Sequence, residues 1–392
     1  MRIAISGAGV AGPAFAYWMR RAGHHVTLIE SAPTFRTGGY VIDFWGLGYR
    51  IAEKMGIAAQ LHEKGYQIQK LRVVGADGRT RAELRVAGIR RATEGKYTSV
   101  ARGDLAATIY HVVENDVETI YSDTITGIDE RDDGVGVTFA SAAPRDFDLV
   151  VGADGLHSRV RSLTFGPDAT HLRYLGCQVA ACVVDGYRPR EEVVYVTYNV
   201  PGKSLGRFAL RDDRTLFLFI FRAEQPDVPV GIEAGRARLR CEFADAGWEC
   251  PQIIEALDGV DELYFDSVSQ VRLDRWCTDR VALVGDAAAC VSLLAGEGTG
   301  LAMVEAYVLA GELQRAGGDF GQAFKAYETR LQPFIEDKQN RASSFVSFFA
   351  ARTWPGIWLR NVGLQAMNLP IVGDLALNRA LRDDIELPEY AI

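Results

Sequence analysis

A glycine-rich turn near the N-terminus constrains the fold of this 392-residue chain more than any other feature. The segment Gly7-Ala8-Gly9-Val10-Ala11-Gly12 follows a predicted strand at residues 3–6, opens a predicted helix at residues 11–21, and is followed by a strand at residues 25–30. Gly7 permits a tight turn, Gly9 lets a pyrophosphate approach the backbone, and Gly12 lets the helix pack closely on the strand. The sequence therefore predicts a β-α-β unit that binds a dinucleotide at the helix N-terminus.

Glu30 ends the second predicted strand, 18 residues after Gly12. A carboxylate at this position accepts hydrogen bonds from the adenosine ribose hydroxyls and repels a 2'-phosphate. An ordinary glycine turn followed by an incidental surface glutamate is the alternative, and the strand-helix context disfavours it. This motif alone does not distinguish FAD from NAD.

Two later segments also run from an apolar strand into a turn, at residues 149–155 and 281–287. The first ends in Asp154-Gly155 and the second contains Gly285-Asp286. Glycine permits a bend at the carboxyl end of a strand, where an aspartate can accept hydrogen bonds from cofactor hydroxyls or backbone amides. Each segment alone is consistent with an ordinary turn. Together with the N-terminal turn they indicate a site for one flavin dinucleotide.

These three motifs, in this order, resemble those of the FAD-dependent monooxygenases of the p-hydroxybenzoate hydroxylase type, the group A flavoprotein monooxygenases, across nearly the whole chain. The resemblance implies an α/β fold with a Rossmann-like FAD-binding domain, an inserted β-rich substrate domain and a helical C-terminal region. It also implies FAD as cofactor, NADPH or NADH as a transient reductant, and O2 as co-substrate. A flavin C4a-hydroperoxide would then hydroxylate an aromatic, polyketide-like or tetracycline-like small molecule.

The resemblance also assigns residues to the cofactor. Asp286 is expected at the flavin ribitol, and Arg102 and Arg36 near the phosphate and ribitol. The glycines around Thr299 open a helix whose amides face the reduced ring. The family's proline shortly before this loop is absent from residues 291–294. The expected cofactor-binding set is Gly7, Gly9, Ala11, Gly12, Glu30, Arg36, Arg102, Asp154, Gly285, Asp286, Gly298, Thr299 and Gly300, with no metal ligand and no assigned catalytic side chain.

The expected substrate-binding residues come from two regions. The family's loop near the isoalloxazine ring matches residues 38–43 and places Tyr40 and Asp43 in the active site. In the β-rich region, Phe217, Phe219 and Phe221 share one strand face, which either floors an aromatic pocket or packs in the core of its own domain. Arg207 either orients an acidic or phenolate substrate or is solvated.

Strand and helix signals predict the domain organisation. The FAD-binding domain comprises residues 1–70, 98–172 and 272–330, the β-rich domain residues 71–97 and 173–271, and the helical region residues 331–392. Turn signals at residues 76–78 and 201–202 predict hairpins. Aromatic residues between positions 345 and 359 have near-helical spacing, which favours core packing over a pocket cover.

Composition excludes several classes of protein. A formal net charge of −8 and a pI near 5.4 argue against a nucleic-acid partner. The uncharged residues 361–373 are too few and too polar for a transmembrane helix, and six scattered cysteines are typical of a reducing, cytoplasmic compartment. Two alternatives to a monooxygenase stay open: a flavin-dependent reductase of the geranylgeranyl reductase type, and a non-catalytic flavoprotein scaffold.

Overall fold

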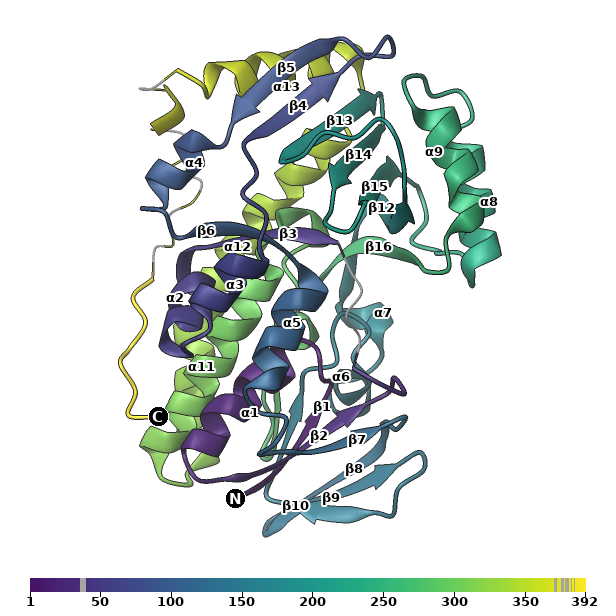
Figure 1. The fold of residues 1–392 in the computed structure, drawn as a ribbon. Helices are drawn as coiled ribbons and strands as arrows, with labels where there is room; N and C mark the ends of the chain where they lie inside the picture. The colour runs from purple at the N-terminus through teal and green to yellow at the C-terminus, as the bar shows by residue number, and fades with distance from the viewer. Residues whose placement is uncertain (36–39, 370–371, 375–376, 378–380, 382, 384) are drawn as a thin grey trace.

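The computed structural model describes residues 1–35, 40–369, 372–374, 377, 381, 383 and 385–392. A five-stranded parallel sheet of order β17-β11-β1-β2-β7 lies in its lower half (Figure 1). The strands are β1 (Arg2–Ser6), β2 (His25–Glu30), β7 (Glu118–Tyr121), β11 (Leu149–Gly152) and β17 (Val281–Leu283). Parallel strands covered on both faces are nearly continuous apolar runs, as β1, β11 and β17 are. The predicted strands at residues 3–6 and 25–30 are confirmed.

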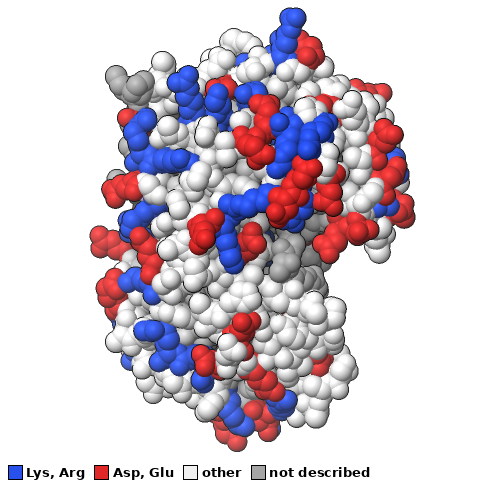
Figure 2. Space-filling model, viewed as in Figure 1, with Lys and Arg blue, Asp and Glu red and all other residues white. Residues whose placement is uncertain are grey.

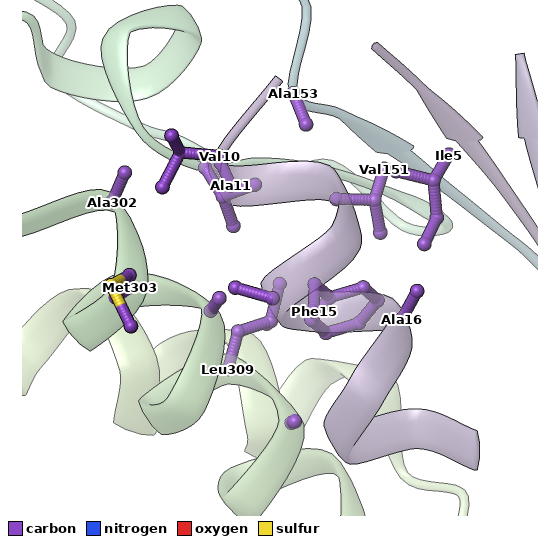
Figure 3. Packing of buried hydrophobic residues seen from close by; sticks show 14 of the residues in the cluster. Ile5, Val10, Ala11, Phe15, Ala16, Val151, Ala153, Ala302, Met303 and Leu309 are labelled. Atoms are coloured by element: carbon purple, nitrogen blue, oxygen red, sulfur yellow. The ribbon is translucent and has the colours of Figure 1, made fainter. Parts of the chain in front are cut away.

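Two helices pack on one face of this sheet, α1 (Ala11–Arg21) and α11 (Gly298–Ala316). Figure 3 shows Phe15 of α1 between the strand residues Ile5 and Val151 on one side and Leu309 of α11 on the other. Small residues of α1 at the crossing let the helix axes approach closely. The helices α2 (Gly46–Lys54), α3 (Ala58–Lys64) and α5 (Arg102–His111) extend this layer.

A three-stranded antiparallel sheet, which the sequence analysis did not predict, adds to the same core. It consists of β8 (Ile125–Arg131), β9 (Gly134–Phe139) and β10 (Arg145–Phe147). Its buried side chains, such as Ile125 and Val137, belong to the hydrophobic cluster of the parallel sheet. The short helices α6 (Arg159–Thr164) and α10 (Asp286–Ala289) follow the ends of β11 and β17, and α7 (Asp168–His171) directly precedes Leu172.

A seven-stranded sheet of order β16-β12-β15-β14-β13-β4-β5 forms the upper half. Its strands are β4 (Lys70–Val74), β5 (Thr80–Arg85), β12 (Leu172–Asp185), β13 (Val194–Val200), β14 (Lys203–Ala209), β15 (Arg214–Arg222) and β16 (Leu263–Val271). Both predicted hairpins are confirmed, with Gly78 and Gly202 at positive φ in the turns. The parallel pairing of β4 with β13 joins two distant segments into one sheet.

The two faces of the seven-stranded sheet have different neighbours. Helices α8 (Ile232–Glu242) and α9 (Cys250–Ala256), followed by a 3-10 turn at Leu257–Gly259, cover one face. The other face packs toward the two-stranded sheet of β3 (Val41–Trp45) and β6 (Tyr97–Ala101) and the short helix α4 (Ala87–Ala92). The position of β3 and β6 between the two large sheets is visible in Figure 1.

Two helices form most of the described C-terminal region. Helix α12 (Phe320–Phe349) runs without interruption through the expected domain limit at residues 330–331. Helix α13 (Trp354–Ala366) packs along β5 through Leu364, but Trp354 and Trp358 are 63% and 66% exposed. Core packing was therefore the wrong prediction for these tryptophans, because α13 lies at the edge of the molecule and buries one stripe.

The surface gives no sign of charge separation on the face in Figure 2, where acidic and basic side chains are mixed. Within the part of the chain that the structure describes, no helix combines the length and the apolar character needed to span a bilayer.

Candidate cofactor site

The glycine turn after β1 has the geometry that its motif predicts. Gly7 has φ of +103°, and a Cβ there would lie 2.5 Å from the Ala153 carbonyl oxygen. A Cβ on Gly12 would clash with the Gly7 carbonyl oxygen, whereas a Cβ on Gly9 would meet no atom within 4 Å. Gly7 and Gly12 therefore shape the turn, and Gly9 leaves open space beside the backbone, as a bound pyrophosphate requires.

The N-terminus of α1 can bind an anion. Val10 at the N-cap makes no side-chain capping bond, and the first turn contains no acidic residue. Its first amides and the positive end of the helix dipole are thus available to a phosphate. Glu30 lies at the end of β2 and accepts hydrogen bonds from the Ala8 and Ala32 amides at 3.0 and 2.8 Å. These bonds tie the end of β2 to the glycine turn.

The three motifs lie in one place. Gly7 faces Ala153 and Asp154 of the second motif. A Cβ on Gly285 would lie 3.1 Å from the Ala11 Cβ and 3.2 Å from the Ala302 Cβ, so the third motif meets the starts of α1 and α11. Figure 3 shows Ala11, Ala153 and Ala302 around this junction. Segments separated by more than 100 residues therefore border the same space beside Gly9.

Asp154 anchors the loop that follows β11. Its carboxylate accepts hydrogen bonds from the Ser158 hydroxyl at 2.5 Å, the Ser6 hydroxyl at 3.2 Å, and the amides of Arg159 and Val160 at 2.8 and 3.1 Å. Three of these donors bind Oδ2 and one binds Oδ1, so Oδ1 keeps acceptor capacity. Asp154 thus fixes its own loop and the start of α6, and its contact with the cofactor stays a prediction.

A buried arginine that the sequence analysis missed joins the second and third motifs. Arg161 is fully buried, and its guanidinium donates to the Leu156 carbonyl at 2.6 Å and to the Ala287 carbonyl at 3.1 Å. It also pairs with Asp168 at 2.5 Å. The sequence of α6 around Arg161 gives no signal of this burial, because Arg159 and Ser162 are polar and Ala287 is 126 residues away.

A buried glutamate supports the third motif. The Glu305 carboxylate accepts a hydrogen bond from the Gly285 amide at 2.5 Å, and the Tyr327 hydroxyl lies 3.4 Å from it. Burial raises the pKa of Glu305 well above its usual value, and the charge of Asp286 adds to this shift. A single acidic residue within the apolar run of α11 was the signal that sequence reasoning left unused.

The start of α11 lies beside Asp286. Gly298, Thr299 and Gly300 form its first turn, which has no acidic residue and no side-chain cap. A Cβ on Gly298 would lie 3.3 Å from Asp286 Oδ1, and one on Gly48 would lie 2.5 Å from the Gly300 Cα. The glycines therefore keep the helix start open toward Asp286 and close to α2.

Arg102 and Tyr40 flank this space from the other side. Arg102 begins α5, and its amide donates to the Tyr40 carbonyl at 3.0 Å. The Arg102 guanidinium is exposed, with no hydrogen-bond or ion-pair partner among the described residues. Burial raises the pKa of Tyr40 to about 12, so its hydroxyl stays protonated. The expected residues Arg36, Gly38 and Gly39 lie outside the described residues.

The four residues expected in the substrate wall of the β-rich domain lie on the wrong face. Phe217, Phe219 and Phe221 are fully buried against α8 and α9. Arg207 is buried on β14 and pairs with both carboxylate oxygens of Glu249 at 2.6 and 2.5 Å. These side chains belong to the core and an internal ion pair of their own domain. Period-two spacing shows that residues share a face but not which element covers it.

The opposite face carries aromatic residues that the sequence analysis missed. Tyr195 of β13, Leu218 of β15 and Tyr264 of β16 pack in one cluster with Tyr40 and Tyr97. The Tyr264 ring lies 5.8 Å from that of Tyr40. On β3, Asp43 accepts hydrogen bonds from the Tyr97 and Ser99 hydroxyls at 2.6 and 2.5 Å. Tyr40 and Asp43 thus lie between the cofactor motifs and the seven-stranded sheet.

The class of protein follows from these observations. A parallel sheet with a glycine turn at an open helix N-terminus, two further strand-end motifs at the same place, and a second sheet facing them define a dinucleotide-dependent oxidoreductase with a separate substrate layer.

Comparison with known proteins identifies the family. Residues 1–340 match the FAD binding domain family model, and the chain belongs to this family of flavin-dependent monooxygenases. An uncharacterised protein of Mycobacterium tuberculosis is 36% identical over 86% of the chain and 91% of that protein. A flavin-dependent monooxygenase of Legionella longbeachae is 33% identical over 86% of the chain and 87% of that protein. The crystal structure of the tetracycline destructase Tet(51) has a TM-score of 0.84 and 31% identity, covering 99% of each chain.

The family membership confirms the predicted fold class, the enzyme class and the cofactor. The chain is an FAD-dependent monooxygenase with a reduced nicotinamide cofactor and O2 as co-substrates. The reductase and scaffold alternatives are therefore set aside.

Proposed function

We propose that this monooxygenase hydroxylates an aromatic or polycyclic, polyketide-like small molecule bound between the seven-stranded sheet and the β3–β6 layer. The observation that carries the proposal is the cluster of aromatic side chains on the sheet face opposite α8 and α9. Tyr40 and Tyr264 of this cluster lie within reach of the charge of Asp286, and Tyr195 lies on the same face of the sheet. Flat aromatic walls favour flat aromatic ligands. The similarity to a tetracycline destructase supports a tetracycline-like substrate class.

The residues around Gly9 fit FAD. The α1 amides would hold the pyrophosphate, Glu30 the adenosine ribose, and Asp286 the ribitol. The first turn of α11 would present amides to negative charge on the flavin ring. Bound FAD supplies the redox and oxygen chemistry. The protein's own residues orient the substrate, exclude water and stabilise charge, so no nucleophilic side chain is required.

Arg102 provides a test of the cofactor assignment. Its unpaired, exposed guanidinium at the start of α5 is placed to neutralise a cofactor phosphate. We expect Arg102→Gln to weaken FAD binding about tenfold, measured by quenching of FAD fluorescence on titration with apoprotein. Arg50→Gln on the exposed surface of α2 is the matched control and should bind FAD normally. Equal FAD affinities of the two variants would show that the Arg102 guanidinium does not contact the cofactor.

The decisive experiment measures NADPH oxidation by the FAD-loaded enzyme with a panel of aromatic and polycyclic compounds, including tetracyclines. A substrate should stimulate NADPH oxidation and O2 consumption and leave a product heavier by the mass of one oxygen atom. If no compound of these classes stimulates oxidation, the substrate proposal fails. If stimulation occurs without an oxygenated product, the compounds are effectors instead of substrates.

The domain limits at residues 70–71, 97–98, 172–173 and 271–272 and the cytoplasmic location remain part of this proposal. The limits are supported by the sheet order, because residues 70–85 and 172–271 supply the strands of the seven-stranded sheet. The location is supported by the six unpaired cysteines.

A further inference from the structure

Asp43 is a carboxylate held in a fixed orientation by two hydroxyl groups. It lies on β3 opposite Ser99 of β6, and the Tyr97 and Ser99 hydroxyls both donate to its Oδ1 atom. Burial and the Asp43 charge raise the pKa of Tyr97, so its hydroxyl remains a donor. Oδ2 receives no hydrogen bond from any residue that the structure describes. One oxygen is therefore anchored and the other is open.

The open oxygen lies where the substrate layer meets the cofactor loop. Asp43 lines a pocket with Gly296, Glu297 and Gly300, at the start of α11. On the other side lies Tyr195, whose pKa is raised by burial of the hydroxyl and, to a smaller extent, by the charge of Asp43. The Tyr195 hydroxyl occupies the space next to Gly206, where a Cβ would lie only 2.1 Å from the hydroxyl oxygen. The ring can therefore lie in this position because residue 206 is a glycine.

No basic side chain that the structure describes lies within ion-pair distance of Asp43. Lys338, near the same pocket, is committed to Glu297 and Asp383 at 2.8 and 2.9 Å. Arg90, whose charge reaches Tyr97, donates to the Ile68 carbonyl at 3.2 Å. Asp43 is exposed, so water solvates its charge in the free protein. An anionic or phenolate substrate would be repelled by this carboxylate, whereas a cationic group would be attracted to it.

We propose that Asp43 binds a protonated amine on the substrate, so that the enzyme selects aromatic polycycles that carry a basic nitrogen. This inference rests on the proposed function and specifies its substrate class. An ammonium group can donate a charge-assisted hydrogen bond to the open Oδ2 atom, while the ring system lies against the aromatic face of the sheet. Because Tyr97 and Ser99 hold the Asp43 carboxylate in one orientation, the amine of the substrate would bind in one position and so orient the ring system.

A pair of probes that differ in one amine tests the inference: tetracycline and 4-dedimethylaminotetracycline. Their dissociation constants are measured by calorimetry with the FAD-loaded enzyme in the absence of NADPH, and NADPH oxidation is measured separately. We expect the wild type to bind the amine probe about tenfold more tightly, and Asp43→Asn to reduce this ratio to near one. Asp116→Asn, in an exposed turn after α5, should keep the wild-type ratio.

The other outcomes separate the inference from the proposed function. Equal binding of both probes by the wild type, with stimulated NADPH oxidation, overturns amine recognition and leaves the function standing. An unchanged ratio in Asp43→Asn assigns the preference to another residue and also overturns it. An equal loss of turnover for both probes, with unchanged binding, identifies Asp43 as a proton acceptor instead. No binding of either probe overturns the inference, whereas the proposed function fails only if the whole panel of aromatic and polycyclic compounds also leaves NADPH oxidation unstimulated.

Discussion

Replacement of Gly9 with leucine is expected to lower FAD affinity about 100-fold while the protein still folds. A Cβ at this position would meet no protein atom within 4 Å, and Gly9 is not among the glycines at positive φ. The new side chain therefore strains nothing in the protein, but it fills the space beside the α1 amides where the pyrophosphate approaches the backbone. A 100-fold loss corresponds to about 2.8 kcal/mol of binding free energy.

The measurement is the dissociation constant of FAD from fluorescence quenching, together with the far-UV circular dichroism and thermal midpoint of the apoprotein. Gly259→Leu is the matched control, because a Cβ on this exposed glycine would also meet no atom within 4 Å and lies far along the chain from the motifs. If Gly9→Leu binds FAD with wild-type affinity, the pyrophosphate does not lie beside Gly9.

Local signals made the cofactor half of the molecule predictable. The bounds of α1 and β2 match their predictions, because turn glycines, apolar runs and helix periodicity all lie within a few residues of one another. The convergence of the three motifs followed from topology alone, since parallel strands place their carboxyl ends at one edge of a sheet.

The substrate half was less predictable, because its decisive contacts are made by distant segments. The alternation in β15 separates Phe217 from Leu218, but the choice of site face depends on α8, which begins ten residues after the strand ends, and on α9 further along the chain. Helix α8 is rich in charged residues, so its sequence carries a weak amphipathic signal, and α9 has only seven residues. The more aromatic face of the strand therefore became the core, and the site received the tyrosines of β13 and β16.

Buried charged residues are a second feature of the site that could not be predicted from the sequence. Arg161 and Glu305 read as surface charges on helices, yet both are buried and bind backbone groups of another motif. Their partners, Ala287 and Gly285, contribute only a carbonyl and an amide, which every residue has. A hydrogen bond to a backbone group leaves no pattern in the side chains of the sequence. A charged residue within an apolar helix, such as Glu305 in α11, nevertheless indicates that such a bond is present.

The stability of the protein should depend on pH through Glu305. Its folded-state pKa is raised by burial, so the folded protein holds this proton more tightly than the unfolded chain, whose glutamate pKa is about 4.3. Where the folded state binds more protons, the free energy of unfolding falls as pH rises. Glu305 therefore contributes a loss of stability that begins as pH passes the unfolded pKa and grows until the folded pKa is reached.

Two substitutions separate this charge from the hydrogen bond to Gly285. Glu305→Gln keeps an acceptor for the Gly285 amide but cannot ionise. The free energy of unfolding of the FAD-loaded variant, measured with urea, should therefore lack the part of the decrease between acidic and neutral pH that Glu305 causes in the wild type. Glu305→Leu leaves the buried Gly285 amide without its acceptor and should lower the free energy of unfolding by about 3 kcal/mol.

The same variants connect stability to the cofactor. Gly285 precedes Asp286, so loss of its amide bond in Glu305→Leu should also weaken FAD binding, whereas Glu305→Gln should retain most of it. Lys325→Gln, on the exposed side of the neighbouring helix α12, is the control and should change stability by less than about 0.5 kcal/mol. A stability for Glu305→Gln that falls with pH as steeply as that of the wild type would place the titrating proton on another group. A stable Glu305→Leu with normal FAD affinity would mean that the Gly285 turn holds without Glu305.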